Sequence, residues 1–314
     1  MAAEIVWNQA TVADWRRLID AASGATLPQS WAYAQAMPTA EGQMPHFGVI
    51  RDSSGEAGCV LVLERRALKV LSRVSIHRGP LWLRADVPAE TVASAFALLR
   101  RRWPRRPWRR VSVIPELPAG AASHALLTEA GYRRAGDGYR SILIDLTLPE
   151  PERLQGLRAT WRHDLQRAER RGLLVEIDRH GKATLPWLTQ NVELDRRLRG
   201  YRGPSQKLAL QLVLAARPYD EALVLVASRE GRRIGGILAI RHGDTATYLI
   251  GWTGAEGREM RATHLLLWRA MEALAAEGVR RFDLGGINPG EAPGLTLFKR
   301  GLGGQEYELV GTYT

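Results

Sequence analysis

A pattern of strands and helices occurs twice along this chain, and it narrows the choice of fold more than any other feature does. In each copy, three strands joined by short turns are followed by a helix and one further strand. The copies are offset by roughly 170 residues, which is typical of a duplicated domain. The first copy comprises segments 46–51, 58–66, 74–77, 89–103 and 110–115, and the second comprises 222–229, 233–241, 245–252, 263–277 and 280–284. The sequence therefore predicts two fused copies of one α+β unit.

The length of the chain agrees with this duplication. Its 314 residues suffice for two domains that each bury a core, and 45% hydrophobic with 25% charged residues is a globular composition. We predict a first domain over residues 1–148 and a second over 149–314. The last strand of the second domain is free to pack back on the first.

Several classes of protein are excluded by the composition. Apolar runs fall far short of the ~20 residues that a membrane span needs. The N-terminus has no basic segment followed by an apolar core, so we predict no signal peptide and expect a cytoplasmic protein. The single cysteine, Cys59, excludes a disulfide framework, and the seven histidines lack metal-ligand spacing. We therefore expect no metal site.

The chain is strongly basic, with a formal net charge of +11 and a pI near 10.3. One interpretation is an anionic partner, such as RNA, a nucleotide-linked substrate or an acidic lipid surface. The other is a general preference for arginine on the surface. Composition does not decide between them.

A glycine-rich stretch near the C-terminus is the clearest local sign of a binding site. The strand 280–284 has Asp283 near its end and runs into Gly285 and Gly286, where the backbone can approach a ligand closely. Lys299 follows in a second stretch that is rich in glycine. Only four of the 44 basic residues are lysines. The use of lysine instead of arginine at this position indicates that the site needs a compact ammonium and not a planar guanidinium.

This stretch supplies the candidate catalytic residues. We expect Lys299 to lie exposed in a loop as a cation for a developing oxyanion or a leaving group, and its replacement by alanine to abolish activity without loss of the fold. Asp283 is a candidate base, or it accepts a backbone hydrogen bond and shapes the loop. Phe298 either packs behind the lysine or stacks on a base.

A basic segment at 152–171 is predicted to form one helix with an apolar stripe on one face. Arginines off the stripe suit phosphate groups of a tRNA acceptor end or a pyrophosphate, or they form a solvated face. The candidate phosphate-binding residues are Arg158, Arg162, Arg167 and Arg170. A second basic stretch, 100–110, includes Trp103 and Trp108 and also suits RNA.

These motifs, in order, resemble the Fem family of aminoacyl-tRNA-dependent transferases. The matching segments extend over about 280 residues, which makes the resemblance far more specific than any one motif. They are Pro28-Gln29-Ser30 with Tyr33, Arg78-Gly79-Pro80, Gly131-Tyr132, Ile144-Asp145-Leu146, Leu157–Gly172, Phe282–Ile287 and Phe298–Gly304.

The resemblance implies two tandem acetyltransferase-like (GNAT) domains, each a mixed, largely antiparallel sheet flanked by helices, without a coiled-coil arm. It also implies transfer of an amino acid from aminoacyl-tRNA, the co-substrate, to an amine, usually on a cell-wall precursor peptide, with no other cofactor. The residues that we assign to substrate binding are Phe298, Arg78, Trp252, Tyr248, Gly285, Gly286 and Arg202.

Departures from the family pattern leave the acceptor and the donor open. Ala36 and Met37 stand where relatives that bind a nucleotide-diphospho-sugar precursor have a lysine, and Ile114 replaces an aspartate. An acyl-CoA-dependent N-acyltransferase on the same fold is one alternative, although Arg261 stands where the CoA loop has a glycine. A non-catalytic protein that binds RNA or a precursor is another.

Overall fold

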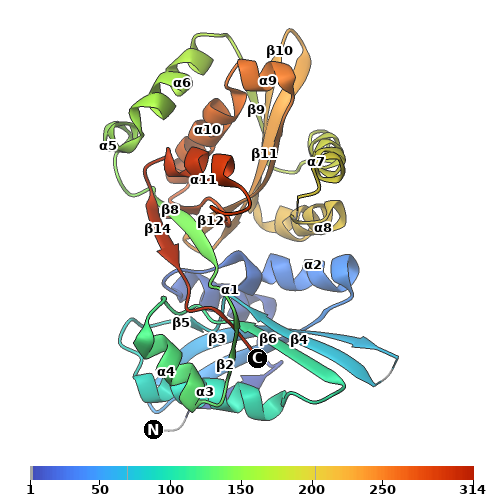
Figure 1. The fold of residues 1–314 in the computed structure, drawn as a ribbon, viewed down its shortest axis with the longest axis vertical. Helices are drawn as coiled ribbons and strands as arrows, with labels where there is room; N and C mark the ends of the chain where they lie inside the picture. The colour runs from blue at the N-terminus through green and yellow to red at the C-terminus, as the bar shows by residue number, and fades with distance from the viewer. Residues whose placement is uncertain (1–2, 69, 202) are drawn as a thin grey trace. The chain divides into compact units, whose positions relative to one another are not determined.

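The computed structural model describes residues 3–68, 70–201 and 203–314. Its contacts divide the chain into two units, Met1–Arg140 with Tyr307–Thr314 and Ser141–Glu306. Each unit contains one mixed, mostly antiparallel sheet flanked by helices (Figure 1). The predicted α+β class and the tandem arrangement are therefore confirmed.

The sheet of the first unit has the order β1-β2-β3-β4-β6-β15-β7, with β5 paired to β3. Its strands are β1 (Glu4–Trp7), β2 (Met44–Asp52), β3 (Gly55–Ala67), β4 (Leu71–His77), β5 (Leu81–Trp82), β6 (Arg109–Ile114), β7 (Arg134–Gly136) and β15 (Thr312–Tyr313). Strand β3 is buried on both faces through its centre, as expected for a strand covered from two sides.

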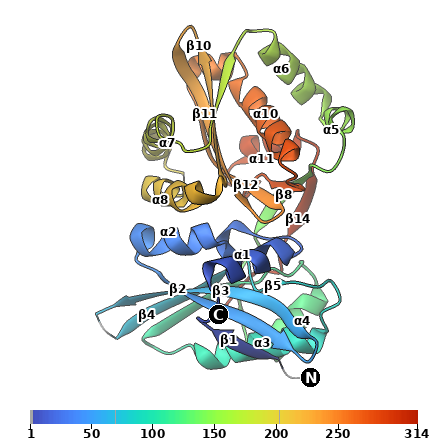
Figure 2. The same cartoon turned by 180° about the vertical axis from the view of Figure 1, so that it is seen from behind.

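Helices cover this sheet on both faces (Figure 2). They are α1 (Val12–Ala21), α2 (Trp31–Glu41), α3 (Ala89–Arg102) and α4 (Ala121–Glu129), with a 3₁₀ turn at Leu27–Gln29. One core cluster joins Val60 and Val62 of β3 to Phe96 and Leu99 of α3. Helices α1 and α2 pack against β2 and β3 on the other side.

The sheet of the second unit has the order β14-β8-β13-β12-β11-β10-β9. Its strands are β8 (Arg140–Asp145), β9 (Leu174–Asp178), β10 (Ala222–Arg229), β11 (Arg232–His242), β12 (Thr245–Thr253), β13 (Arg281–Asp283) and β14 (Gln305–Glu308). Its helices are α5 (Glu150–Gly156), α6 (Ala159–Glu169), α7 (Leu185–Arg199), α8 (Gln206–Ala216), α9 (Ala255–Glu259), α10 (Ala262–Ala276) and α11 (Pro293–Arg300), with a 3₁₀ turn at Arg217–Tyr219. The sheet packs against α10 and α7, while α6 packs on α10.

The repeat that the sequence predicts recurs in the strand pairing. In the first unit β2, β3 and β4 form an antiparallel meander, and β6 then pairs parallel to β4 after α3. In the second unit β10, β11 and β12 form the meander, and β13 pairs parallel to β12 after α10.

Three local features differ from the expectations. The boundary between the units lies at Arg140/Ser141 instead of 148/149, because β8 pairs with β13 of the second sheet. The basic helix is broken into α5 and α6 at Leu157, whose side chain is buried while its backbone is extended. The segment around Lys299 is the helix α11 and not a loop.

The C-terminal strand β15 lies in the first sheet, paired with β6 and β7.

Candidate active site

The candidate site lies where β12 and β13 stop pairing. The two strands pair in parallel only from Thr245 opposite Arg281 to Thr247 opposite Asp283. Beyond this point β13 ends, whereas β12 continues with a bulge in which Leu249 has no partner on β11. The loop after β13 and the helix α11 therefore face the free part of β12.

Lys299 of α11 reaches back to this loop. Its Nζ donates hydrogen bonds to the carbonyl oxygens of Gly285, at 3.2 Å, and Gly286, at 2.9 Å, and lies 5.7 Å from the ring centroid of Tyr248. An ammonium has three donors, and in the described part of the chain the third has no hydrogen-bond partner. The two carbonyls and the aromatic ring hold the positive charge at one point.

The expected exposure of Lys299 is wrong. The residue is only 5% exposed, because it lies with Thr296 on the inner face of α11. Burial lowers the pKa of its ammonium to about 8, and the nearby Asp283 carboxylate acts in the opposite direction. The lysine is therefore a buried cation that can lose its proton near neutral pH. Its replacement also has consequences for stability, contrary to the sequence-based expectation.

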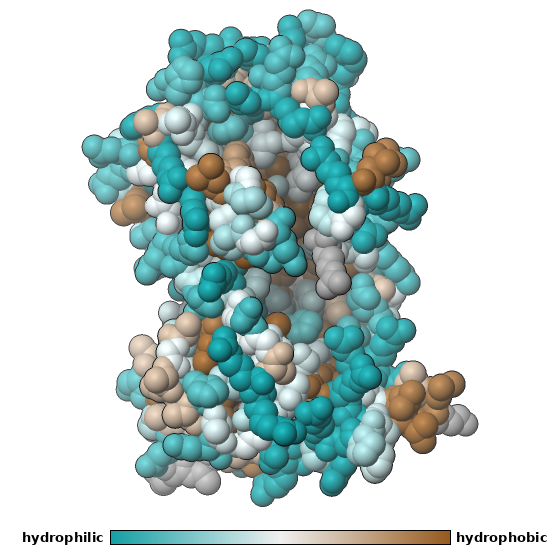
Figure 3. All heavy atoms as spheres, viewed as in Figure 1, coloured by the Kyte–Doolittle hydropathy of each residue, from teal (hydrophilic) through white to brown (hydrophobic). Residues whose placement is uncertain are grey.

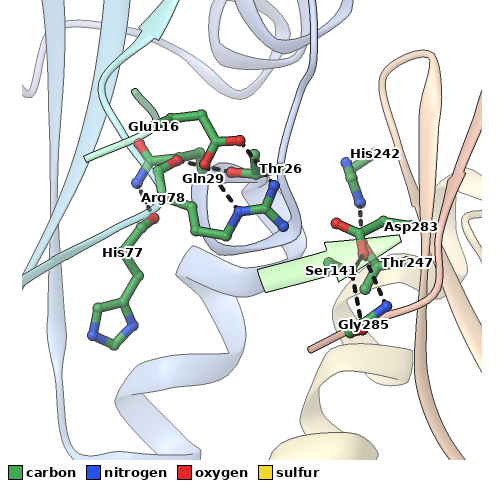
Figure 4. Close-up of polar contacts among 10 residues, drawn as sticks. All are labelled: Thr26, Gln29, His77, Arg78, Glu116, Ser141, His242, Thr247, Asp283 and Gly285. Carbon is green, nitrogen blue, oxygen red and sulfur yellow. Dashed lines mark hydrogen bonds and ion pairs between the residues drawn. The ribbon is translucent and has the colours of Figure 1, made fainter. Parts of the chain in front are cut away.

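Asp283 shapes the loop after β13. Its Oδ1 accepts hydrogen bonds from the backbone N–H of Gly285, at 2.8 Å, and from Ser141 Oγ, at 2.5 Å (Figure 4). Ser141 also lies 2.9 Å from the Gly285 carbonyl oxygen. The carboxylate is buried, so its geometry favours the loop-shaping alternative over contact with a substrate. Its role as a base stays a prediction.

The two glycines allow the loop to lie directly against β12. Gly285 has φ +72°, and a Cβ at this position would lie 2.8 Å from the backbone oxygen of Tyr248. A side chain would therefore be strained and would also collide with β12. Gly286 is exposed and supplies the shorter of the two bonds to Lys299.

Tyr248 and Phe298 lie on the same side of the second sheet as Lys299, packed against the core under α10. Burial raises the pKa of the Tyr248 hydroxyl. The Phe298 ring contacts His264 at 5.1 Å and Trp161 at 6.0 Å. Burial lowers the pKa of His264 to about 4, so this ring is neutral at physiological pH. Phe298 is therefore partly buried against aromatic residues of α6 and α10, and its role towards a substrate stays a prediction.

Trp252 does not join this group. Its ring packs edge to face on Trp187 of α7, with centroids 5.5 Å apart, on the opposite face of the sheet from Tyr248. The bulge at Leu249 falls between the two aromatic residues. Arg202, also assigned to substrate binding, lies outside the described residues.

The four candidate phosphate-binding arginines lie along α6 and at its two ends. Arg158 and Arg170 are exposed, and Arg162 and Arg167 are half-buried. Arg167 is 4.0 Å from Asp164, whereas Arg158 and Arg162 have no acidic partner among the residues that the structure describes. The helix therefore leaves at least two guanidinium groups available for an anion.

The loop that would hold CoA pyrophosphate is occupied by Arg261. This residue has φ +61°, a left-handed conformation that favours glycine, and its Nε donates to Asp164 Oδ1 at 3.0 Å. An arginine thus takes the glycine position at the start of α10, and its side chain is tied to α6.

Arg78 belongs to the first unit. It forms two hydrogen bonds with Glu116, at 2.8 and 2.9 Å (Figure 4). Its guanidinium carbon also lies 4.7 Å from the ring centroid of Tyr139 and 5.6 Å from that of Tyr307. The turn before the Gly79–Pro80 bond is held by Gln29, whose amide donates to the His77 carbonyl. The side chain that we assigned to substrate binding is thus paired with a carboxylate, and its contact with a substrate stays a prediction.

The two tryptophans of the basic stretch at 100–110 differ in burial. Trp103 is buried and packs on Trp7, so it is not available for stacking on RNA bases. Trp108 is 53% exposed. Over the described ranges no group of three His, Cys, Asp or Glu side chains could hold a metal ion.

Sequence reasoning missed several residues of the site. Ser141 lies far from Asp283 in the sequence, and only the pairing of β8 with β13 brings them together. The contact of His264 with Phe298 and Trp161 depends on how α6, α10 and α11 pack. A helical pattern at 293–300, with Thr296 and Lys299 three residues apart, was the available signal for α11.

Comparisons with known proteins bear on the fold of the chain. Residues 155–300 match the family model described as Acetyltransferase (GNAT) domain. No curated protein sequence matches the chain significantly. The crystal structure of FemX superimposes with a TM-score of 0.81 at 15% identity, covering 98% of this chain and 96% of FemX.

Two further solved structures have the same general architecture. One is the C-terminal domain of a protein described as a lysylphosphatidylglycerol synthetase from Agrobacterium fabrum, with TM-score 0.57, 15% identity and coverage of 96% and 92%. The other is a tandem GNAT protein from the clavulanic acid biosynthesis pathway, with TM-score 0.53, 14% identity and coverage of 99% and 97%. The resemblance to the Fem family is thus confirmed at the level of the fold. The chain has a tandem GNAT fold that is similar over almost its whole length to that of FemX, and residues 155–300 match the acetyltransferase (GNAT) family model.

Proposed function

We propose that this protein transfers an amino acid from aminoacyl-tRNA to an amine, with Lys299 at the reaction centre. The family match and the fold support an acyltransferase in general. In the proposed reaction a neutral amine attacks the ester carbonyl, a C–N bond forms, and the bond from the carbonyl to the ribose oxygen breaks. The amine gives up one proton and the departing ribose hydroxyl gains one.

The observation that supports this role is the buried ammonium of Lys299. Its charge is fixed by the carbonyls of Gly285 and Gly286, and one donor remains for a developing oxyanion or the departing oxygen. A pKa of about 8 means that the ammonium can also pass its proton to the leaving group near neutral pH. Asp283 and Ser141 act as positioning residues in this proposal, since they hold the loop that holds the lysine.

Arg261 favours tRNA over CoA as the donor. CoA-dependent enzymes of this fold need a glycine in the loop before the helix so that backbone N–H groups reach the pyrophosphate. Here the position carries an arginine side chain that is bonded to Asp164. The arginines of α6, in contrast, suit the phosphates of a tRNA acceptor end.

The acceptor is an amine-bearing small molecule or peptide. FemX-like architecture supports a cell-envelope precursor within this class, while Ala36, Met37 and Ile114 depart from the usual precursor-binding pattern. Because charged tRNA is a cytoplasmic substrate, the proposed reaction takes place in the cytoplasm. No helix in the described residues is long and apolar enough to cross a membrane.

The test supplies two donors in parallel. Radiolabelled aminoacyl-tRNA or radiolabelled acetyl-CoA is incubated with the protein and a low-molecular-mass extract of the source cells, and label in tRNA-free product is counted. We expect transfer from aminoacyl-tRNA, a loss of at least about a hundredfold in Lys299→Met, and normal turnover in the exposed-lysine control Lys207→Met.

The alternatives give different results in the same assay. Label that moves only from acetyl-CoA assigns the protein to the CoA-dependent class. Binding of tRNA without turnover, unchanged in Lys299→Met, assigns it to non-catalytic binding. Circular dichroism of Lys299→Met separates loss of chemistry from loss of fold, which the burial of this residue makes necessary.

A further inference from the structure

The hairpin between β3 and β4 ends in apolar side chains that the described residues leave exposed. Leu68 is 83% exposed and Val70 is 67% exposed, and Leu71 and Trp108 are also exposed. The backbone pairing brings them together, since Leu71 pairs with Ala67 and the Ser72 N–H donates to the Trp108 carbonyl. Figure 3 shows this tip as a brown projection at the lower right. Apolar patches of this kind mark interaction sites.

A row of three arginines crosses the sheet directly behind the tip. Arg65 of β3 pairs with Arg73 of β4, and Arg73 pairs with Arg110 of β6. Directly paired residues point to the same face, so three like charges lie side by side. All three are exposed, and none has an acidic partner among the described residues. Like charges side by side are destabilising on their own, and a bound anion would offset their repulsion.

The spacing between the tip and the arginines fits a lipid surface. Leu71 precedes Arg73 by two residues of an extended strand, which corresponds to roughly 7 Å. Apolar groups of interfacial proteins enter a bilayer by roughly 5–10 Å, with basic groups at the level of the phosphates and tryptophan at the interface. Leu71 and Trp108 also border a hollow of about 410 Å³. Arg109 lines it together with Arg66 and Glu64, which form an ion pair at 3.1 Å.

We propose that the β3–β4 tip docks this protein on an anionic phospholipid surface, with Leu68, Val70 and Leu71 inserted and Arg65, Arg73 and Arg110 on the lipid phosphates. RNA would satisfy the arginines, but it offers nothing to exposed leucine and valine side chains. A lipid surface accounts for both features. This inference is independent of the proposed reaction.

The test is co-sedimentation of the full-length protein with sucrose-loaded vesicles. One set contains phosphatidylcholine alone, and the other contains about 30% phosphatidylglycerol to supply negative surface charge. We expect binding to the anionic vesicles only. Binding to the anionic vesicles is expected to weaken about a hundredfold in the triple variant Arg65→Gln, Arg73→Gln and Arg110→Gln. It is expected to weaken at least about tenfold in the double variant Leu68→Ser and Val70→Ser.

Matched controls change the same side-chain types elsewhere. Leu174→Ser with Leu198→Ser removes exposed leucines of the second unit, and Lys182→Gln with Lys207→Gln and Arg232→Gln removes three exposed charges. Both controls are expected to bind vesicles like the wild type. All of the altered side chains are exposed, so the variants are expected to fold, and thermal unfolding checks this.

Several results would overturn the proposal. The proposal is wrong if the wild-type protein does not co-sediment with anionic vesicles. Vesicle binding that survives the Leu68/Val70 variant shows simple electrostatic adsorption. A change of oligomeric state in that variant, measured by light scattering, assigns the tip to a second copy of the chain. Loss of tRNA binding in the arginine variant, with vesicle binding intact, assigns the row to RNA.

Discussion

Lys299 lies beside the glycine turn, as its sequence context predicts, but in an environment that the sequence does not reveal. Nearby glycines indicated an open loop, whereas the side chain is buried under the turn at Gly285 and Gly286. Its burial depends on a contact with residues about a dozen positions earlier in the chain, and local pattern does not encode such contacts. The sequence was enough to select Lys299 as a candidate, but it did not predict the burial that lowers the pKa of its ammonium.

This burial predicts a specific pH dependence of stability. The pKa of Lys299 falls from its ordinary value of 10.5 to about 8 in the folded protein. Between these values the unfolded chain binds more protons than the folded protein, so this group makes the free energy of unfolding rise with pH in this window. Below pH 8 its full cost, about 3 kcal/mol, is present, and above pH 10.5 it is absent.

Lys299→Met removes this titration while retaining an apolar chain of similar length. We expect the stability of the wild type relative to the variant to increase as the pH rises from about 8 to 10.5. Urea unfolding at a series of pH values measures this difference. Lys207→Met, which removes an exposed lysine of α8, is the control for loss of positive charge alone. If the difference in the free energy of unfolding between wild type and Lys299→Met stays constant from about pH 8 to 10.5, the ammonium is not desolvated in the folded protein.

At the scale of elements, the turn after β13 joins the strand, β12 and α11. Gly285 is the position where all three meet, because its backbone accepts from Lys299, donates to Asp283 and lies against the Tyr248 carbonyl. We expect Gly285→Ala to lower the free energy of unfolding by about 1–3 kcal/mol through backbone strain alone, with a further loss from the collision. We also expect it to reduce turnover, because the carbonyls that hold Lys299 move.

The variant Gly278→Ala separates the effect of backbone strain from the effect of the collision with β12. Gly278 has φ +77°, close to that of Gly285, but a Cβ there would meet nothing within 4 Å. Chemical denaturation of both variants is the measurement. The loss of stability in Gly278→Ala should be the smaller one, and its turnover should match the wild type. Equal losses would mean that close approach to β12 contributes nothing.

Elements with regular patterns were predictable, and elements set by packing were not. The strands β10–β12 match their predicted ranges to within one residue at each end, because alternation and tight turns are local signals. Strand β3 was also predicted, although it begins at Gly55 and not at residue 58. The break between α5 and α6 was missed, because the apolar stripe continues through Leu157 and only packing of Gly303 on the Gly156 backbone shows the interruption. Helix α11 was missed because flanking glycines and prolines indicated a loop.

At the scale of the whole molecule, the sequence revealed the duplication but misplaced the boundary. Both units follow the order of meander, helix and parallel strand. Strand β8 was assigned to the first domain because it follows that domain in the sequence. Its pairing with β13 is a contact between segments more than 130 residues apart, which periodicity cannot detect.

The net charge of +11 is a property of the whole chain that the structure divides among distinct groups. Many arginines are paired, as Arg78 is with Glu116 and Arg261 is with Asp164. The exposed Arg158 and Arg170 and the half-buried Arg162 lack an acidic partner in the described part of the chain. These groups, and not the total charge, are expected to determine how tRNA binding responds to salt.

Counterion release makes this expectation quantitative. Each arginine–phosphate contact adds about 0.7–0.9 to the slope of log affinity against log salt concentration. If α6 contacts tRNA, Arg158→Gln with Arg162→Gln and Arg170→Gln should reduce that slope by about 2–3. Fluorescence anisotropy with labelled tRNA from 50 to roughly 300 mM salt measures it. The control Lys182→Gln with Lys207→Gln and Arg232→Gln removes the same charge from other exposed positions. If both variants lower the slope equally, tRNA responds to net charge and α6 is no specific contact.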